Sequence, residues 1–351
     1  LTPFAERVTR LAESEELDVF GFAPDGVELA AGQIQGHRWL GPDRGWTAVR
    51  TEFPDVLWNR YFPRDQDELM GALQAEGVPF INNSSLDKWE ACRCLAAHGG
   101  PISEHLPQTR LLTDARVALE MLEQHAVVYI KPVCGSIGRG IIRMERESPR
   151  TMRLTYVSRD TDRLRQVYAT EEQLTRWVVS RQRTGRFIVQ QGLALAVVDG
   201  RPADVRVLVQ KDAAARWHVT GMGARLAGHG RFTANLHTGG EGIPVAVLAE
   251  VVAPESRARQ AALIAELERL ALQTAQAAEQ CAGPLGEIGL DLGVDQRGRT
   301  WYIELNGQPG RAIFEHLGRW DLAELAHLRP IQYARRLAGR KTARVAGHTA
   351  T

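Results

Sequence analysis

The 351-residue sequence has little of several features that mark particular classes of protein. No run approaches the ~18 apolar residues of a membrane span, and the charged opening LTPFAERVTRLAESEELDVF does not resemble a signal peptide. There are only four cysteines, scattered and without a C-x-x-C pair, which favours reduced thiols over a metal site. With 43 basic and 42 acidic residues, the chain lacks the charge excess of a nucleic-acid or membrane-surface binder. These absences favour a cytoplasmic globular protein.

Hydrophobic periodicity predicts a mixed chain of helices and strands without internal repeats. Strand-like segments at 55–61 and 78–83 enclose a helical segment at 65–77, which predicts a parallel β–α–β unit. The segment SSLDKWEACRCLAAHG has the start signal, spacing and glycine stop of a helix. Further helices are predicted at 113–124 and 255–281, and further strands at 126–131, 140–144, 186–191, 203–210 and 217–226.

The segment KPVCGSIGRG, residues 131–140, combines a lysine with three glycines in six positions. Glycine-rich loops beside a lysine often bind phosphate, because small residues let backbone N–H groups surround the oxygens. Lys131 precedes the glycines, however, whereas the P-loop lysine follows them. Strand-like residues flank the loop on both sides, so the sequence predicts a β-hairpin rather than a strand-to-helix cradle.

The segment 288–306, IGLDLGVDQRGRTWYIELN, predicts a second hairpin with its turn at 297–298. The expected pairing places Asp291 opposite Glu304, with Gly293 opposite Tyr302. Because side chains alternate along a strand, one face is apolar and directed at the core. That face comprises Leu290, Leu292, Val294, Trp301, Ile303 and Leu305.

The other face of this hairpin carries Asp291, Glu304 and Asn306. Opposed side chains lie about 4.5–5.5 Å apart, and like charges at that distance are destabilising. A divalent cation between the carboxylates would remove the repulsion, and Mg²⁺ is typically held by one or two carboxylates plus phosphates. An exposed polar face without a ligand is the alternative interpretation.

Taken together, these motifs resemble the ATP-grasp superfamily, and more closely its YheC/YheD branch, known as endospore coat-associated proteins. The resemblance covers about 86–310. TANLHTGG, residues 233–240, also resembles a segment of RimK-type glutamate ligases. The segments that carry the resemblance to the branch are KPVCGSIGRGI, QQGLAL, DVRVLVQ, GLDLGVD and WYIELNGQPGR.

The resemblance implies an α/β (α+β) ATP-grasp fold. We expect a Rossmann-like pre-ATP-grasp domain over 1–85 and a central subdomain with the glycine-rich lid over 86–190. A C-terminal subdomain with the magnesium site would follow over 191–330. The basic tail, 331–351, is interpreted as a solvated helix end rather than a docking site.

The resemblance further implies that ATP and Mg²⁺ are the cofactors. Asp291, Glu304 and Asn306 match the metal ligands of the superfamily. Many relatives have an acidic residue at the end of the adenine-binding hinge, where this sequence has glutamines. The residues matched to nucleotide contacts are Lys88, Lys131, Gly135, Ser136, Gly138, Arg139, Gly140, Gln190, Gln191, Leu193 and Asn235.

ATP-grasp enzymes typically join a carboxylic acid to an amine through an acyl phosphate, releasing ADP and phosphate. We therefore expect a carboxylate–amine ligase acting on small molecules or peptides, without nucleic-acid or membrane partners and compatible with a homo-oligomer or spore-coat association. Arg206 and Arg311, and Arg225 as a third candidate, would bind oxyanions through their guanidinium groups. Two alternatives stay open: a kinase that stops at phosphoryl transfer, and a structural coat protein that keeps the nucleotide fold without catalysis.

Overall fold

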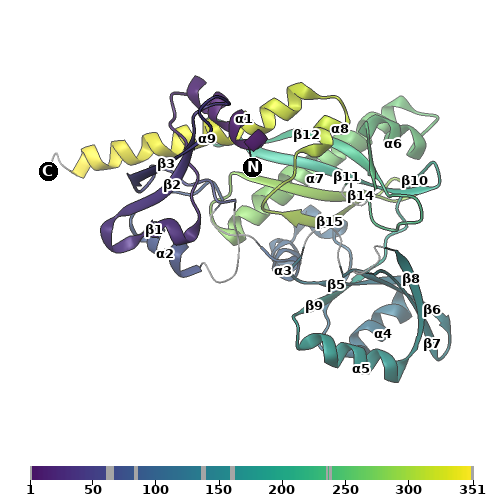
Figure 1. The fold of residues 1–351 in the computed structure, drawn as a ribbon. Coiled ribbons are helices and arrows are strands. Elements are labelled where there is room, and N and C mark those ends of the chain that lie inside the picture. The colour runs from purple at the N-terminus through teal and green to yellow at the C-terminus, as the bar shows by residue number, and fades with distance from the viewer. Residues whose placement is uncertain are drawn as a thin grey trace.

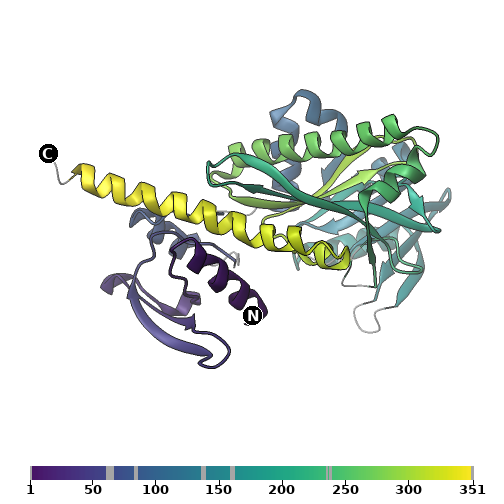
Figure 2. The ribbon, with the colours of Figure 1, turned by 90° about the horizontal axis from the view of Figure 1, so that it is seen from above.

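A computed structural model of the chain describes residues 2–60, 67–82, 86–135, 140–158, 163–234, 236 and 239–348. These residues form three sheets. Figure 1 shows an N-terminal region, a large central lobe and a smaller lobe that carries α4 and α5, and Figure 2 shows the last helix running along the first two.

The N-terminal region is built on an antiparallel sheet, β1-β2-β3 (Val27–Glu28, Gln33–Trp39, Trp46–Glu52), with α1 (Thr2–Ser14) and α2 (Asp67–Ala75). The predicted β–α–β unit is reduced to one parallel bridge, Leu57 to Phe80, so the strands expected at 55–61 and 78–83 were wrong. A Rossmann-like layout is not confirmed. Trp58 and Arg60 direct their side chains to Glu287 of the central lobe, which draws this segment away from strand pairing.

The smaller lobe, called here the lid lobe, is a six-stranded sheet in the order β4-β9-β5-β6-β7-β8. Its strands are Thr109–Leu111, Phe187–Gln191, Val127–Pro132, Ile142–Ser148, Thr151–Val157 and Leu164–Thr170. Its helices, α4 (Ala115–Gln124) and α5 (Glu171–Gln182), begin at the side-chain caps Asp114 and Thr170. β5 and β6 pair antiparallel on either side of the glycine segment, which confirms the predicted hairpin.

The central lobe contains the order β13-β12-β11-β14-β15, with β10 paired to β11. Its strands β10 to β15 are Val197–Val198, Arg201–Lys211, Trp217–Leu226, Glu241–Ile243, Glu287–Val294 and Thr300–Asn306. Its helices α3, α6, α7, α8 and α9 are Lys88–His98, Val245–Val252, Arg257–Ala282, Ala312–His316 and Trp320–His348. Val205, Val207 and Leu290 pack in one core with Leu267 and Leu270 of α7. Leu208 packs with residues of α8 and α9, so helices cover both faces of this sheet.

The final hairpin departs from its predicted register in its outer half. Asp291 faces Glu304 as predicted, but a bulge follows, and Leu292 then pairs with Tyr302. The bulge reverses the faces beyond it. Tyr302 therefore enters the core in place of Trp301, whereas Ile303 lines a cavity. The prediction that Trp301 and Ile303 share the core face was wrong.

Two features of the chain differ from expectation. Cys94 on α3 and Cys281 on α7 form a disulfide, although the scattered cysteines suggested reduced thiols. The boundary proposed at 330 lies inside α9, and the tail after it is helical to His348 with Ile331 and Tyr333 buried, so its first part packs against the protein. No helix of the described residues has the length and apolarity of a membrane span.

Candidate functional site

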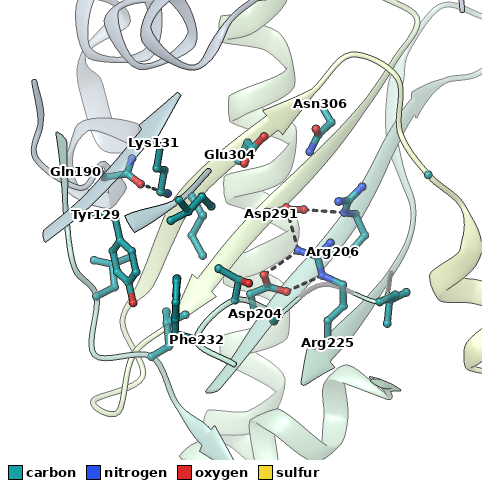
Figure 3. A pocket seen from close by; sticks show the side chains of 18 of the residues that line it. Tyr129, Lys131, Gln190, Asp204, Arg206, Arg225, Phe232, Asp291, Glu304 and Asn306 are labelled. Atoms are coloured by element: carbon teal, nitrogen blue, oxygen red, sulfur yellow. Dashed lines mark hydrogen bonds and ion pairs between the residues drawn. The ribbon is translucent and has the colours of Figure 1, made fainter. Parts of the chain in front are cut away.

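A cavity of about 330 Å³ lies where the lid lobe meets the central lobe. The lid lobe contributes β5 and β9, and the central lobe contributes β11, β12, β14, β15 and the segment after β15 (Figure 3). Most of the predicted site residues that the structure describes surround this one space. Those that line it are Lys131, Gln190, Gln191, Leu193, Arg206, Arg225, Asp291, Glu304 and Asn306.

The sequence GLDLG explains how β14 makes room for the site. On a strand, Gly289, Asp291 and Gly293 share one face. A Cβ at Gly289 would lie 2.9 Å from Cβ of Pro309 and 3.1 Å from Nη1 of Arg206, and a Cβ at Gly293 would lie 2.7 Å from Leu195. The two glycines thus leave space for a guanidinium on one side of Asp291 and for an apolar wall on the other.

Four charged side chains form a continuous chain along this face (Figure 3). Nε of Arg206 lies 2.7 Å from Oδ1 of Asp291, and Nη2 of Arg225 lies 2.9 Å from Oδ2. Arg225 also donates two hydrogen bonds of 2.7 Å to Asp204, through Nε and Nη2. Charges of opposite sign therefore alternate from Asp204 through Arg225 and Asp291 to Arg206.

Burial and the neighbouring arginines shift the pKa values of the two aspartates, Asp204 and Asp291, in opposite directions. For Asp204, burial is the largest influence and raises the pKa to about 6, although Arg225 opposes the shift. Asp291 is also buried, but Arg206 and Arg225 both favour its charged form, and its pKa is lowered. Asp291 is therefore an anion available to a cation.

Two lysines, Lys131 and Lys88, supply positive charge in addition to the two arginines. Burial lowers the pKa of Lys131, whose Nζ lies 2.5 Å from Oε1 of Gln190. Nζ of Lys88 lies 3.1 Å from Glu304 and donates a 2.6 Å hydrogen bond to the carbonyl of Gly135. Lys88 thus contacts both Glu304 and the first residue of the glycine segment.

The donor set fits a hard divalent cation. Asp291 and Glu304 are directly opposed, and Asn306 lines the same cavity. Oδ1 of Asp291 is buried, and its 2.7 Å contact with Nε of Arg206 lacks hydrogen-bond geometry, so a metal bound there would take the place of that guanidinium. The part of the chain that the structure describes contains no cluster of three His, Cys, Asp or Glu, so a metal here would take two carboxylates and an amide. That set suits Mg²⁺ with phosphate oxygens completing the shell.

Arg311 does not line the cavity. Its buried guanidinium donates to Oε2 of Glu287 and to the carbonyls of Ala326 and Pro309. The structure therefore gives it a place in the core rather than the predicted contact with substrate. Among the other predicted contacts, Gly140 is not a lining residue, and Ser136, Gly138, Arg139 and Asn235 lie outside the described residues.

Several residues that line the cavity were not predicted from the sequence. Asp204 lies two positions before Arg206 and Tyr129 two before Lys131, so strand alternation could have found both. Phe232 and Gln308 lie in irregular segments, where no periodicity predicts direction. Phe232 stacks near Tyr129, with ring centroids 5.9 Å apart, and so joins the two lobes at the cavity.

Comparisons with known proteins agree with this geometry. The YheC/D-like ATP-grasp family matches residues 77–337. The endospore coat-associated protein YheD of Bacillus subtilis strain 168 is 27% identical over 340 residues, which are 94% of this chain and 73% of YheD.

Solved structures share the fold at much lower identity. The ATP-grasp ligase PsnB with a minimal precursor has a TM-score of 0.52 at 14% identity, covering 93% of this chain and 94% of its own. A ligase of Chryseobacterium gregarium, associated with RiPPs, has a TM-score of 0.51 at 11% identity, covering 92% of each chain. The protein has the ATP-grasp fold and belongs to the YheC/D-like ATP-grasp family.

Proposed function

We propose that the protein is an ATP- and Mg²⁺-dependent ligase that joins a carboxylate to an amine through an acyl phosphate. One observation carries the proposal: a buried lysine, two opposed carboxylates with an amide, and two arginines converge on a single cavity. Phosphoryl transfer depends mainly on alignment and charge neutralisation, and this set supplies both.

The nucleotide would lie across the junction of the lobes. Tyr129, Leu193 and Ile303 offer apolar surface to the base beside the hinge glutamines. Lys131 would contact the phosphates, and Lys88 would join it once its carboxylate partner is engaged elsewhere. The glycine segment is joined to Lys88 through Gly135, so closure over the phosphates would be linked to that lysine.

Asp291, Glu304 and Asn306 would hold Mg²⁺. When bound, the ion would neutralise negative charge on the phosphates of the nucleotide. Arg206 would then bind the oxygens of the incoming carboxylate and of the transferred phosphoryl group, because a guanidinium group pairs with two oxygens at once. Arg225 would lie beside it, held by its two hydrogen bonds to Asp204. Exclusion of water once both substrates fill the cavity would protect the acyl phosphate until the amine reacts.

The substrates are proposed to be small acids or peptides. Peptide substrates are favoured by the fold neighbours, since PsnB is described in complex with a minimal precursor and the Chryseobacterium enzyme with a leader and core peptide. The relationship to YheD suggests association with the endospore coat. A coat protein without catalysis is the second candidate, but the complete set of charged cavity residues argues for retained chemistry.

The test is release of ADP and phosphate in the presence of Mg²⁺ and a panel of acids, amines and short peptides. Asp291→Asn and Glu304→Gln should each abolish release, whereas Glu250→Gln, on the exposed surface of α6, should leave it unchanged. ADP with a phosphorylated product and no free phosphate would identify a kinase. Nucleotide binding that is indifferent to Mg²⁺ and to both cavity substitutions would refute the proposal.

A further inference from the structure

We propose that Asp204 is a positioning residue that fixes Arg225 in place and leaves Arg206 as the arginine that moves to the substrate oxyanion. This inference rests on the proposed function, because it concerns how the site exchanges its internal ion pairs for Mg²⁺ and phosphate. Asp204 was not among the residues that the motifs identified, and no part of the proposed reaction assigns it a task.

The two arginines are held in different ways. Arg225 makes a two-pronged pair with Asp204, with both hydrogen bonds at 2.7 Å. Arg206 lies 2.7 Å from Asp291, but neither its Nε nor Oδ1 of Asp291 has a hydrogen-bond partner among the described residues. Arg225 is therefore held by two well-aligned hydrogen bonds to Asp204, whereas the contact between Nε of Arg206 and Asp291 is single and poorly aligned.

The register of the sheet produces this difference. Asp204 stands directly opposite Arg225 on β12, and Arg206 directly opposite Asp291 on β14. On their other sides, Asp204 faces Gly293 and Arg206 faces Gly223. Because Gly293 and Gly223 have no side chains, Asp204 and Arg206 each have room to turn toward the charged residue on the other neighbouring strand.

The site is charge-balanced in this arrangement, since two carboxylates meet two guanidiniums. Both arginines contact Asp291, so each would compete with a metal ion for that carboxylate. Once Asp291 is committed to a metal, Arg225 still has both bonds to Asp204. Arg206 then has lost its carboxylate contact and, with Gly289 leaving space around Nη1, is the group available to an oxyanion.

Removing the charge of Asp204 should therefore weaken metal binding. In Asp204→Asn, Arg225 would have Asp291 as its remaining carboxylate partner and would hold it against the metal. We expect the affinity of Mg²⁺, measured calorimetrically with a non-hydrolysable ATP analogue present, to fall by about 10- to 100-fold. In the double variant D204N/R225M the competing guanidinium is gone, and affinity should return to within a few-fold of the unchanged protein.

This recovery separates positioning from a purely structural role, in which the double variant would bind no better than D204N. Equal affinity in D204N and the unchanged protein, or no recovery in the double variant, would overturn the inference. If D204N does not fold, D204E replaces it, because one added methylene displaces the two-pronged pair; unchanged affinity there would also overturn it. Failure of the unchanged protein to bind Mg²⁺ with the analogue would instead refute the proposed function.

Discussion

Replacing Arg311 with methionine distinguishes a core role from a catalytic one. Arg311 is 8% exposed, and its guanidinium reaches Oε2 of Glu287, which is itself 1% exposed. Removing one partner of a buried ion pair typically costs about 3–5 kcal/mol. Trp58, Arg60 and Gln210 would still donate to Glu287, which places the expected loss near the lower end, about 3 kcal/mol.

The assay is urea denaturation followed by tryptophan fluorescence, with ATP turnover measured below the transition. The double variant E287Q/R311M should lose less stability than the two single losses added together, because no unpaired charge stays buried. Turnover per folded molecule should persist in R311M. A variant as stable as the unchanged protein but without turnover would refute this reasoning and restore Arg311 to the catalytic role that its position beside the motif suggested.

Three further outcomes are expected. Burial, aided by Arg311, lowers the pKa of His327 to about 4, so the unfolded state takes up the proton first as pH falls. The contribution of His327 to the free energy of unfolding should therefore decrease between about pH 6.5 and 4, by at most about 3 kcal/mol. It is measured as the difference between the denaturation curves of the unchanged protein and His327→Gln, because Asp204, whose pKa is raised to about 6, contributes in the opposite direction in both proteins. Gly289→Ala should displace both Arg206, which lines the cavity, and Pro309, which lies in the segment after β15, and lower turnover about tenfold or more. Gly71→Ala, with open space at its Cβ, should not lower turnover; equal turnover in both would contradict the site geometry. Lys131→Met should weaken ATP binding by about 10- to 100-fold in a fluorescent-analogue titration, and unchanged affinity would exclude its contact with phosphate.

The sequence predicted best where pattern and pairing are local. The helix at 255–281, the strand at 217–226 and the opposition of Asp291 to Glu304 all follow from periodicity within one or two elements. The register error after Asp291 has a different origin. A bulge inserts one residue without any glycine or proline to mark it, so alternation alone exchanges Trp301 and Tyr302.

Long-range partners account for the other misses. Arg311 follows the metal ligands closely, and nothing local reveals that Glu287, 24 positions earlier, lies under its guanidinium. The two long strands of the antiparallel sheet at 27–52 are mostly polar, and the second of them is largely exposed, so they give little apolar alternation to detect. Pairing of Cys94 with Cys281 spans 187 positions and depends on α3 crossing α7, a packing relation that spacing cannot convey.

That same pairing closes a ring in the covalent structure. Cys94 precedes every strand of the lid lobe and Cys281 lies near the end of α7, so the ring contains the entire lid lobe together with β10 to β13, α6 and nearly all of α7 of the central lobe. A protease that cuts anywhere inside the ring would therefore produce two pieces that travel as one species in electrophoresis until a reductant is added. The disulfide would keep the two fragments covalently linked, so a single backbone cut would not separate the lid lobe from the central lobe.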